Sequence, residues 1–135
     1  MASIFMEFLI DADCARVWDA VRDVGAVHQR LVPGMVTQTE LEDGVRTVHF
    51  ANGLVAREAI IDCDDARCRL AYSVQGGWAS HHHASIQVFA EGPTRSRIAW
   101  TTDVLPDALK PSIAAMMEQG AAIMQHTLAR ERSHQ

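Results

Sequence analysis

The chain has 135 residues, enough for one domain with its own hydrophobic core. Apolar residues make up 48% of it, charged residues make up 21%, and the formal net charge is -5. An acidic chain with scattered Lys and Arg is a poor match for nucleic acid, and no apolar run approaches the roughly 20 residues that cross a bilayer. We therefore expect a single domain over residues 1–135 that binds no nucleic acid and has no stable membrane insertion.

The cysteines and the N-terminus bear on the compartment. Cys14, Cys63 and Cys68 form no CxxC motif and no even set, so reduced thiols are expected. The first residues carry no basic segment of the kind that begins a signal peptide. These features predict a cytoplasmic protein.

The N-terminal third of the chain predicts a strand and two short helices. Residues 3–10 alternate, with Ile4 and Ile10 on the apolar, inner face. Residues 11–23 follow as a helix, capped by Asp11 or Asp13, with apolar side chains at helical spacing. Residues 25–34 predict a second short helix that ends at Pro33-Gly34.

The rest of the chain predicts a meander of six strands and then one long helix. Asp43-Gly44 is a strong hairpin signal, and similar short turns separate the later strands. The expected strands cover residues 35–43, 45–51, 54–64, 67–74, 81–91 and 95–104. Residues 106–135 predict a helix with Pro111 in its first turn and an apolar stripe. This order is that of an α+β fold whose sheet packs on helices and leaves a concavity where an apolar ligand can bind.

The segment IFMEFLIDADCARVWDAVRDVGAVHQRLVP and the order of elements after it resemble the SRPBCC superfamily. This superfamily includes START-like lipid carriers, birch-pollen-allergen proteins, polyketide cyclase/dehydrase-like proteins and plant abscisic acid receptors. The resemblance covers the whole chain. It implies a helix-grip fold, in which a seven-stranded curved antiparallel sheet wraps around a long C-terminal helix and two short helices follow the first strand.

Two short motifs resemble loops of the abscisic acid receptors. NGLVA at residues 52–56 resembles their gate loop, and GGWASH at residues 76–81 resembles their latch loop. The latch matches only in its two glycines, and the gate has Val55 where the receptors have proline. The resemblance therefore implies two loops at a cavity mouth, but neither hormone sensing nor phosphatase inhibition.

Three histidines in a row begin the strand at residues 81–91. Adjacent strand residues point to opposite faces, so three converging metal ligands are not possible here. His82 shares the apolar face with Ala84 and Ile86, which we expect to face the cavity, while His81 could line the mouth. No metal and no cofactor are expected.

Alternation on the other strands supplies further inward residues. In residues 54–62 either Arg57 or Glu58 must share a face with apolar neighbours, and the pattern leaves this open. The resemblance to the receptors implies a pocket carboxylate at Glu58, which also turns Ile60 inward. The predicted ligand-binding residues are Arg46, Val48, Phe50, Leu54, Glu58, Ile60, Tyr72, Trp78, His81, His82, Ala84, Ile86, Trp100, Met117, Gly120 and Met124.

Three functions fit this cavity. The first is binding of a small, mostly apolar molecule, a lipid, polyketide, isoprenoid or aromatic compound, by a monomer or homodimer. The alternative is a polyketide cyclase/aromatase- or dehydratase-type enzyme, with His82 as base, Glu58 as orienting group or acid and Tyr72 as donor. The third is a protein-interaction module that uses an exposed Trp78. Purely structural roles for the inward polar residues remain open beside all three.

Overall fold

The chain folds as an antiparallel sheet that curves around a long helix. The computed structural model describes residues 1–133, with side chains as far as residue 129. The strands are β1 (Ala2–Ile10), β2 (Val36–Glu42), β3 (Val45–Phe50), β4 (Val55–Asp64), β5 (Arg69–Gln75), β6 (His81–Ala90) and β7 (Ser96–Leu105). The helices are α1 (Cys14–Arg22), α2 (Val27–Arg30), the 3₁₀ turn η1 (Asp107–Leu109) and α3 (Lys110–Ser133).

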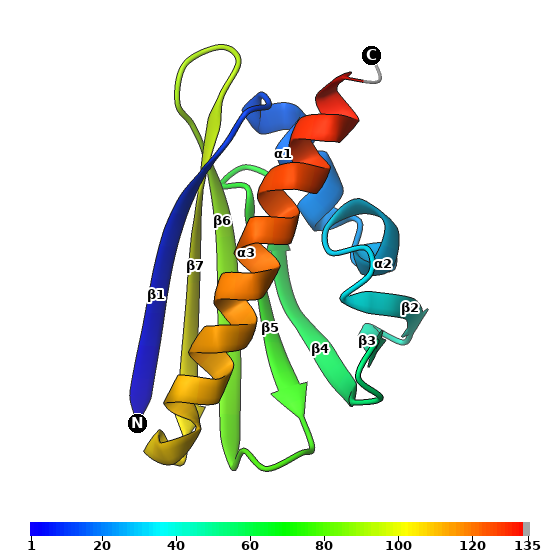
Figure 1. Ribbon diagram of the computed structural model, residues 1–135, viewed down its shortest axis with the longest axis vertical. Helices are drawn as coiled ribbons and strands as arrows, with labels where there is room; N and C mark the ends of the chain where they lie inside the picture. The colour runs from blue at the N-terminus through cyan, green and yellow to red at the C-terminus, as the bar shows by residue number, and fades with distance from the viewer. Residues whose placement is uncertain (134–135) are drawn as a thin grey trace.

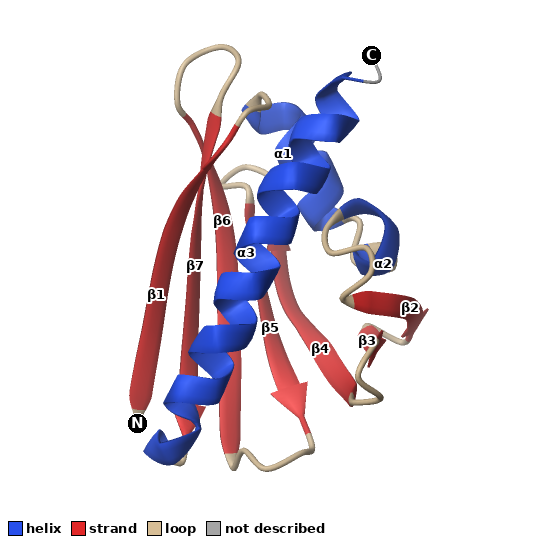
Figure 2. Cartoon of the chain, viewed as in Figure 1, coloured by secondary structure: helices blue, strands red, loops and turns tan. Residues whose placement is uncertain are grey.

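The seven strands lie in the order β1-β7-β6-β5-β4-β3-β2, and every neighbouring pair is antiparallel. Strands β2 to β7 are therefore a meander, and β1 joins its far edge beside β7. Figure 1 shows α3 running along one face of this sheet, with α1 and α2 beside its C-terminal half. All helices cover the same face in Figure 2, so the other face is left to solvent. The predicted helix-grip α+β fold is confirmed.

The β2–β3 hairpin turns at Asp43-Gly44, as the sequence predicted. Both residues have positive φ, 52° and 76°. A two-residue turn with left-handed backbone at both positions matches the twist of the strands that it joins. This turn sets the register in which Arg46 lies opposite Leu41.

Burial follows the predicted alternation on the strands. On β3, Arg46 and Val48 are buried, and on β6 the apolar side chains from Ala84 onward are buried at every second position. On β4, the sequence pattern left open whether Arg57 or Glu58 points inward. In the structure Arg57 is exposed and Glu58 points inward. The inner face of the sheet is therefore the even-numbered face from β3 to β7, on β4 as far as Ile60.

The sequence pattern missed a bulge in β4. Ile60 lies opposite Tyr72 and Asp62 lies opposite Ala71, so Ile61 is an extra residue between them. Ile61 is 56% exposed although it is strongly apolar. Ile61 follows the inward Ile60 and so points outward, and beyond it the bulge shifts the alternation by one residue, so that Cys63 lies opposite the buried Leu70.

Helix α1 closes one end of the sheet with a solid core. Val17, Trp18, Ala20 and Val21 are buried, and they belong to the same buried cluster as Ile10 at the end of β1. Asp13 occupies the N-cap position, but its side chain makes no cap hydrogen bond and pairs with Arg16 at 3.2 Å. The stability of α1 therefore comes chiefly from its buried face.

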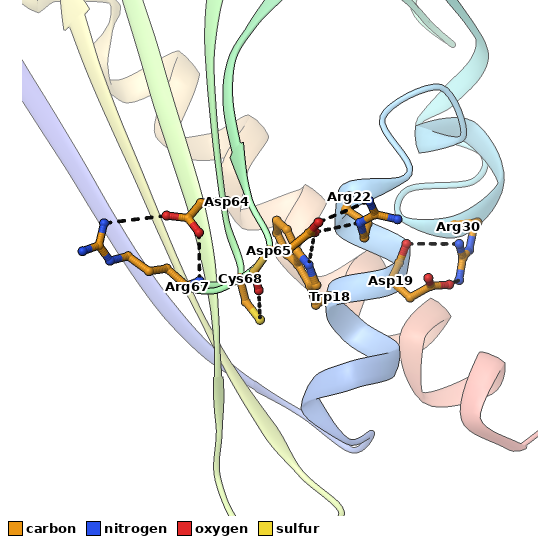
Figure 3. A network of polar contacts seen from close by, with 8 residues as sticks. All are labelled: Trp18, Asp19, Arg22, Arg30, Asp64, Asp65, Arg67 and Cys68. Carbon is orange, nitrogen blue, oxygen red and sulfur yellow. Dashed lines mark hydrogen bonds and ion pairs between the residues drawn. The ribbon is translucent and has the colours of Figure 1, made fainter.

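One aspartate fastens α1 to the turn between β4 and β5, as Figure 3 shows. Trp18 donates from Nε1 to Oδ1 of Asp65 at 2.9 Å, and Arg22 donates from Nε to the same oxygen at 2.9 Å. Arg30 of α2 pairs with Asp19 and Asp23 on the far side of α1. We call Trp18, Arg22 and Asp65 the α1 clamp.

Helix α3 buries the stripe that its sequence predicted. Met117, Met124 and Leu128 are almost fully buried, and Gly120 lies among them. None of the helices within residues 1–133 combines the length and the apolar character needed to span a membrane. The three cysteines, all within this range, are free thiols.

Candidate functional site

A cavity of about 400 Å³ lies between the sheet and α3. This volume is in the range of sites for drug-sized ligands. Its lining is mostly apolar and comes from the helices, from strands β2 to β7 and from two loops. The lining residues are Val21, Val27, Leu31, Val32, Met35, Val36, Arg46, Val48, Phe50, Leu54, Val55, Ala56, Glu58, Leu70, Tyr72, Val74, Gln75, Gly76, Gly77, Trp78, Ala79, His82, Ile86, Trp100, Thr102, Leu109, Ser112, Ile113, Met116, Met117, Gly120 and Met124.

The structure places the predicted ligand-binding residues around this cavity, with three exceptions. His81 is exposed and begins β6 on the outer face, so it is not part of the lining. Ala84 is buried between the larger Tyr72 and Thr102 of the neighbouring strands, and its methyl group does not reach the cavity. Ile60 packs against the core beside the β4 bulge.

Part of the lining was absent from the sequence-based prediction. Val21 of α1, Val27 of α2 and Met35 after α2 reach the cavity, as do Ile113 and Met116 of α3. Their apolar helical spacing was visible in the sequence, but the same spacing also describes an ordinary core. Which apolar side chains line a hollow depends on how the layers pack.

The polar centre of the cavity is an ion pair between neighbouring strands. Arg46 on β3 and Glu58 on β4 lie directly opposite in the register, and Nε donates to Oε1 at 2.6 Å. The side chains are only 6% and 12% exposed. Because both charges are desolvated together, removing either partner would leave an unpaired buried charge.

The guanidinium group of Arg46 has spare hydrogen-bonding capacity. Its Nη1 is buried and has no partner within the described part of the chain. Its Cζ lies 4.8 Å from the centre of the Tyr72 ring, a cation–π contact. Arg46 therefore sits between a carboxylate and an aromatic ring, at the wall of the cavity.

Tyr72 is held by Trp100 and keeps its proton. The indole Nε1 of Trp100 donates to the Tyr72 hydroxyl oxygen at 3.2 Å. Burial, followed by the negative charge of Glu58, raises the pKa of Tyr72 to about 12. The phenol is therefore neutral at physiological pH, where it can donate a proton in a hydrogen bond and is not a base.

His82 lies at the start of β6, two positions before Ala84, the register partner of Tyr72, and it lines the cavity. Burial lowers the pKa of His82, and the neighbouring His81 lowers it further. The neutral imidazole is thus the favoured form at pH 7. A neutral imidazole can accept a proton or a hydrogen bond from a ligand.

The mouth of the cavity is formed by the β3–β4 and β5–β6 loops. Trp78 is 88% exposed, and Leu54 and Val55 across the mouth are also largely exposed. Gly76 and Gly77 have φ of 82° and 74°, a backbone region that other residues rarely adopt. The chain turns there so that Trp78 stands at the rim.

The three consecutive histidines do not converge. His82 faces the cavity, while the rings of His81 and His83 stack with centroids 6.4 Å apart on the outer face. Within the described residues, no group of three or more His, Cys, Asp or Glu side chains is arranged to hold a metal ion.

The profile of the family described as "Polyketide cyclase / dehydrase and lipid transport" matches residues 1–132. The chain belongs to this family. The expected resemblance to the SRPBCC superfamily is thereby confirmed at the level of sequence as well as fold. No curated protein matches the chain significantly.

Solved structures that share this fold include proteins with several different names. An uncharacterized protein from Bacillus thuringiensis aligns with a TM-score of 0.85 at 16% identity, over 94% of this chain and 98% of that one. Norcoclaurine synthase from Thalictrum flavum, in complex with a transition-state analogue, aligns with a TM-score of 0.73 at 19% identity, over 96% and 95%. The di-domain ARO/CYC protein BexL aligns with a TM-score of 0.83 at 13% identity, over 95% of this chain and 46% of that one. At these identities the likeness establishes the fold alone.

Proposed function

We propose that the chain binds a small, mostly apolar molecule, of the size of an aromatic, isoprenoid or polyketide fragment, in the cavity between the sheet and α3. The observation that carries this proposal is the cavity itself, whose lining is mostly apolar. Its wall also holds a polar cluster, which consists of the Arg46–Glu58 ion pair and Tyr72 beside it. Burial of apolar ligand surface contributes roughly 25 cal/mol per Å² before the costs of binding. The polar cluster orients the ligand, and the rim around Leu54 and Trp78 limits access.

The test is mass spectrometry of the natively purified protein, before and after denaturation, for a small molecule that the protein retains. The matched variants are Ala56→Phe, which places a ring in the cavity, and Ala59→Phe, which places the same ring on the outer face of β4. We expect an apolar compound to be released from the wild type and from A59F but not from A56F. A wild-type protein that carries no compound and binds none from a panel of lipids, isoprenoids and polyketide-like aromatics would contradict the proposal.

A second candidate is an enzyme of the cyclase or dehydratase type. The observation that favours it is the presence of Glu58, Tyr72 and His82 in the lining of one cavity. His82, neutral and half-buried, would remove a proton, and Tyr72 would donate to the oxygen on which charge develops. Two solved relatives of the same fold are named as a synthase and as an ARO/CYC protein, which supports testing turnover.

The enzyme candidate is tested with the compound that the mass spectrometry identifies. We expect His82→Ala to lower turnover at least about 100-fold if His82 is the general base, since such catalysis contributes 10² to 10⁴. The control is His83→Ala, one residue along on the outer face. Equal turnover by the wild type and H82A would reject this role.

A further inference from the structure

The cavity wall carries hydrogen-bond donors that the protein itself leaves unused. An arginine has five N–H donors. The described residues supply a hydrogen-bond acceptor for Arg46 only at Nε, which donates to Glu58, and Nη1 is buried without a partner. A buried donor without a partner is costly, so a site that retains one points to an acceptor outside the chain.

Tyr72 supplies a second donor beside the first. Its hydroxyl oxygen already accepts from Trp100, and no described residue accepts its hydroxyl proton. Tyr72 is 8% exposed and its ring lies 4.8 Å from the Arg46 guanidinium carbon. Both residues line the cavity, so the two free donors belong to one small region of its wall.

The charge of this region limits what the donors can hold. Glu58 pairs with Arg46 at 2.6 Å and balances its charge. A ligand carboxylate would add a second negative charge next to Glu58, in a mostly apolar cavity where the described lining residues include no Lys or Arg besides Arg46. A carbonyl oxygen accepts two hydrogen bonds without adding a charge.

We propose that the ligand binds with a neutral carbonyl group, as in a ketone, aldehyde, ester or quinone, whose oxygen accepts hydrogen bonds from Arg46 and Tyr72. This inference rests on the proposed function, because it assigns the polar end of the molecule that the cavity holds. It separates carbonyl compounds from free fatty acids and other carboxylates as ligand classes.

The experiment uses three probes with the same ring and the same number of non-hydrogen atoms: 2-acetylnaphthalene, 2-isopropylnaphthalene and 2-naphthoate. Their dissociation constants are measured by calorimetry on the wild-type protein. We expect the ketone to bind about tenfold more tightly than the hydrocarbon, as one or two net hydrogen bonds allow, and also more tightly than the acid.

The variants remove the donors without leaving an unpaired charge. Tyr72→Phe removes the hydroxyl group and keeps the ring, and the double variant Arg46→Met with Glu58→Gln removes both charges of the pair. In each variant we expect the preference for the ketone over the hydrocarbon to fall from about tenfold to about threefold, because each variant removes one of the two donors and keeps the other. Arg57→Met, on the outer face of β4, is the matched control and should keep the full preference.

A second readout reports on the carbonyl group directly. With a ¹³C-labelled carbonyl, the infrared stretch of bound 2-acetylnaphthalene should lie at lower frequency in the wild type than in either variant. If the donors of Arg46 and Tyr72 serve only the fold, the carbonyl stretch of the bound ketone would have the same frequency in the wild type and in both variants.

The outcomes separate this inference from the proposed function. Equal affinity for the ketone and the hydrocarbon, or tightest binding of 2-naphthoate, would overturn the carbonyl assignment and leave a cavity that binds apolar molecules. Failure of all three probes to bind would count against the proposed function itself, and the carbonyl assignment would fall with it.

Discussion

The charge inside the cavity depends on the protonation state of single side chains. His82 matters most at the residue scale, because histidine has an ordinary pKa near neutral pH. Burial, and then His81, lowers the pKa of His82 below its usual value of 6.5. We expect the imidazole resonances of His82 to titrate with a midpoint below 6.5, measured by NMR. His81→Gln should move this midpoint upward by part of the shift, because burial is the larger cause.

His83→Gln is the control for this titration. His83 lies on the outer face of β6 and is not among the causes of the His82 shift, so the midpoint should not move. A wild-type midpoint at or above 6.5 would contradict the burial that the structure gives to His82. It would also remove the neutral base on which the enzyme candidate depends.

At the scale of elements, the α1 clamp joins a helix to a turn that is far away in the sequence. A hydrogen bond from Trp18, followed by one from Arg22, lowers the pKa of Asp65 below its usual value near 3.8. A carboxylate with a lowered pKa stabilises the folded state above its unfolded-state pKa, and this stabilisation is lost as the pH falls through the folded-state value.

We therefore expect Asp65→Asn to lower the urea midpoint of unfolding at neutral pH, and the difference from wild type to shrink as the pH falls below the usual aspartate pKa near 3.8. Trp18→Phe removes the N–H donor and also part of the buried indole, so it should destabilise the protein at every pH, by more at neutral pH where Asp65 is ionised. The matched control is Asp62→Asn, an exposed aspartate on β4. An equal pH dependence for Asp65→Asn and wild type would show that the ionisation of Asp65 does not stabilise the folded state.

At the scale of the whole molecule, one end of the sheet is packed solid against α1 and the rest is hollow beneath α3. Gly120 of α3 lies against the ring of Trp100 on β7. A Cβ there would meet the ring of Trp100 at 3.4 Å and 3.5 Å, which is ordinary contact. Because glycine is a poor helix former, Gly120→Ala should raise the free energy of unfolding by about 0.5 to 1 kcal/mol.

The matched control for this change is Ala122→Gly on the exposed side of α3, which should lower stability by a similar amount. Both are measured by urea denaturation. If Gly120→Ala instead destabilises the protein, the ring of Trp100 does not move to accommodate the added methyl group. The wall of the cavity at Trp100 would then be rigid. The added methyl group should also weaken binding of a ligand that fills the cavity to the helix.

Much of the fold could be predicted because its signals are local. Alternation predicted the inner faces of β3, β5, β6 and β7, Asp43-Gly44 predicted a hairpin, and the helical spacing on α3 predicted its buried stripe. The choice of Glu58 over Arg57 needed the resemblance to known receptors, because either residue satisfied the pattern. The bulge at Ile61 was missed, since one additional residue in a strand leaves no local mark.

The site was less predictable because it depends on distances between elements. Ala84 has the right parity but is too short to pass its larger neighbours, and His81 has the wrong parity for the cavity. The α1 clamp joins Trp18 to Asp65, and no pattern within either segment indicates the other. That a hollow exists beside Phe50, Trp100 and Met117, and is not filled by them, is a property of the assembled layers.

The two ends of the described chain lie at opposite ends of the sheet, as Figure 1 shows. The amino group of Met1 pairs with Asp107 at 3.3 Å, and the backbone N–H of Ser80 bonds Leu105 nearby, so the N-terminus lies at the same end as the β5–β6 loop. The far end of α3 lies beside α1, away from that loop. A protein anchored to a sensor surface through the end of α3 would hold the cavity mouth toward the solution, whereas anchoring through Met1 would turn it toward the support. The site of attachment therefore decides whether an immobilised sample can take up its ligand.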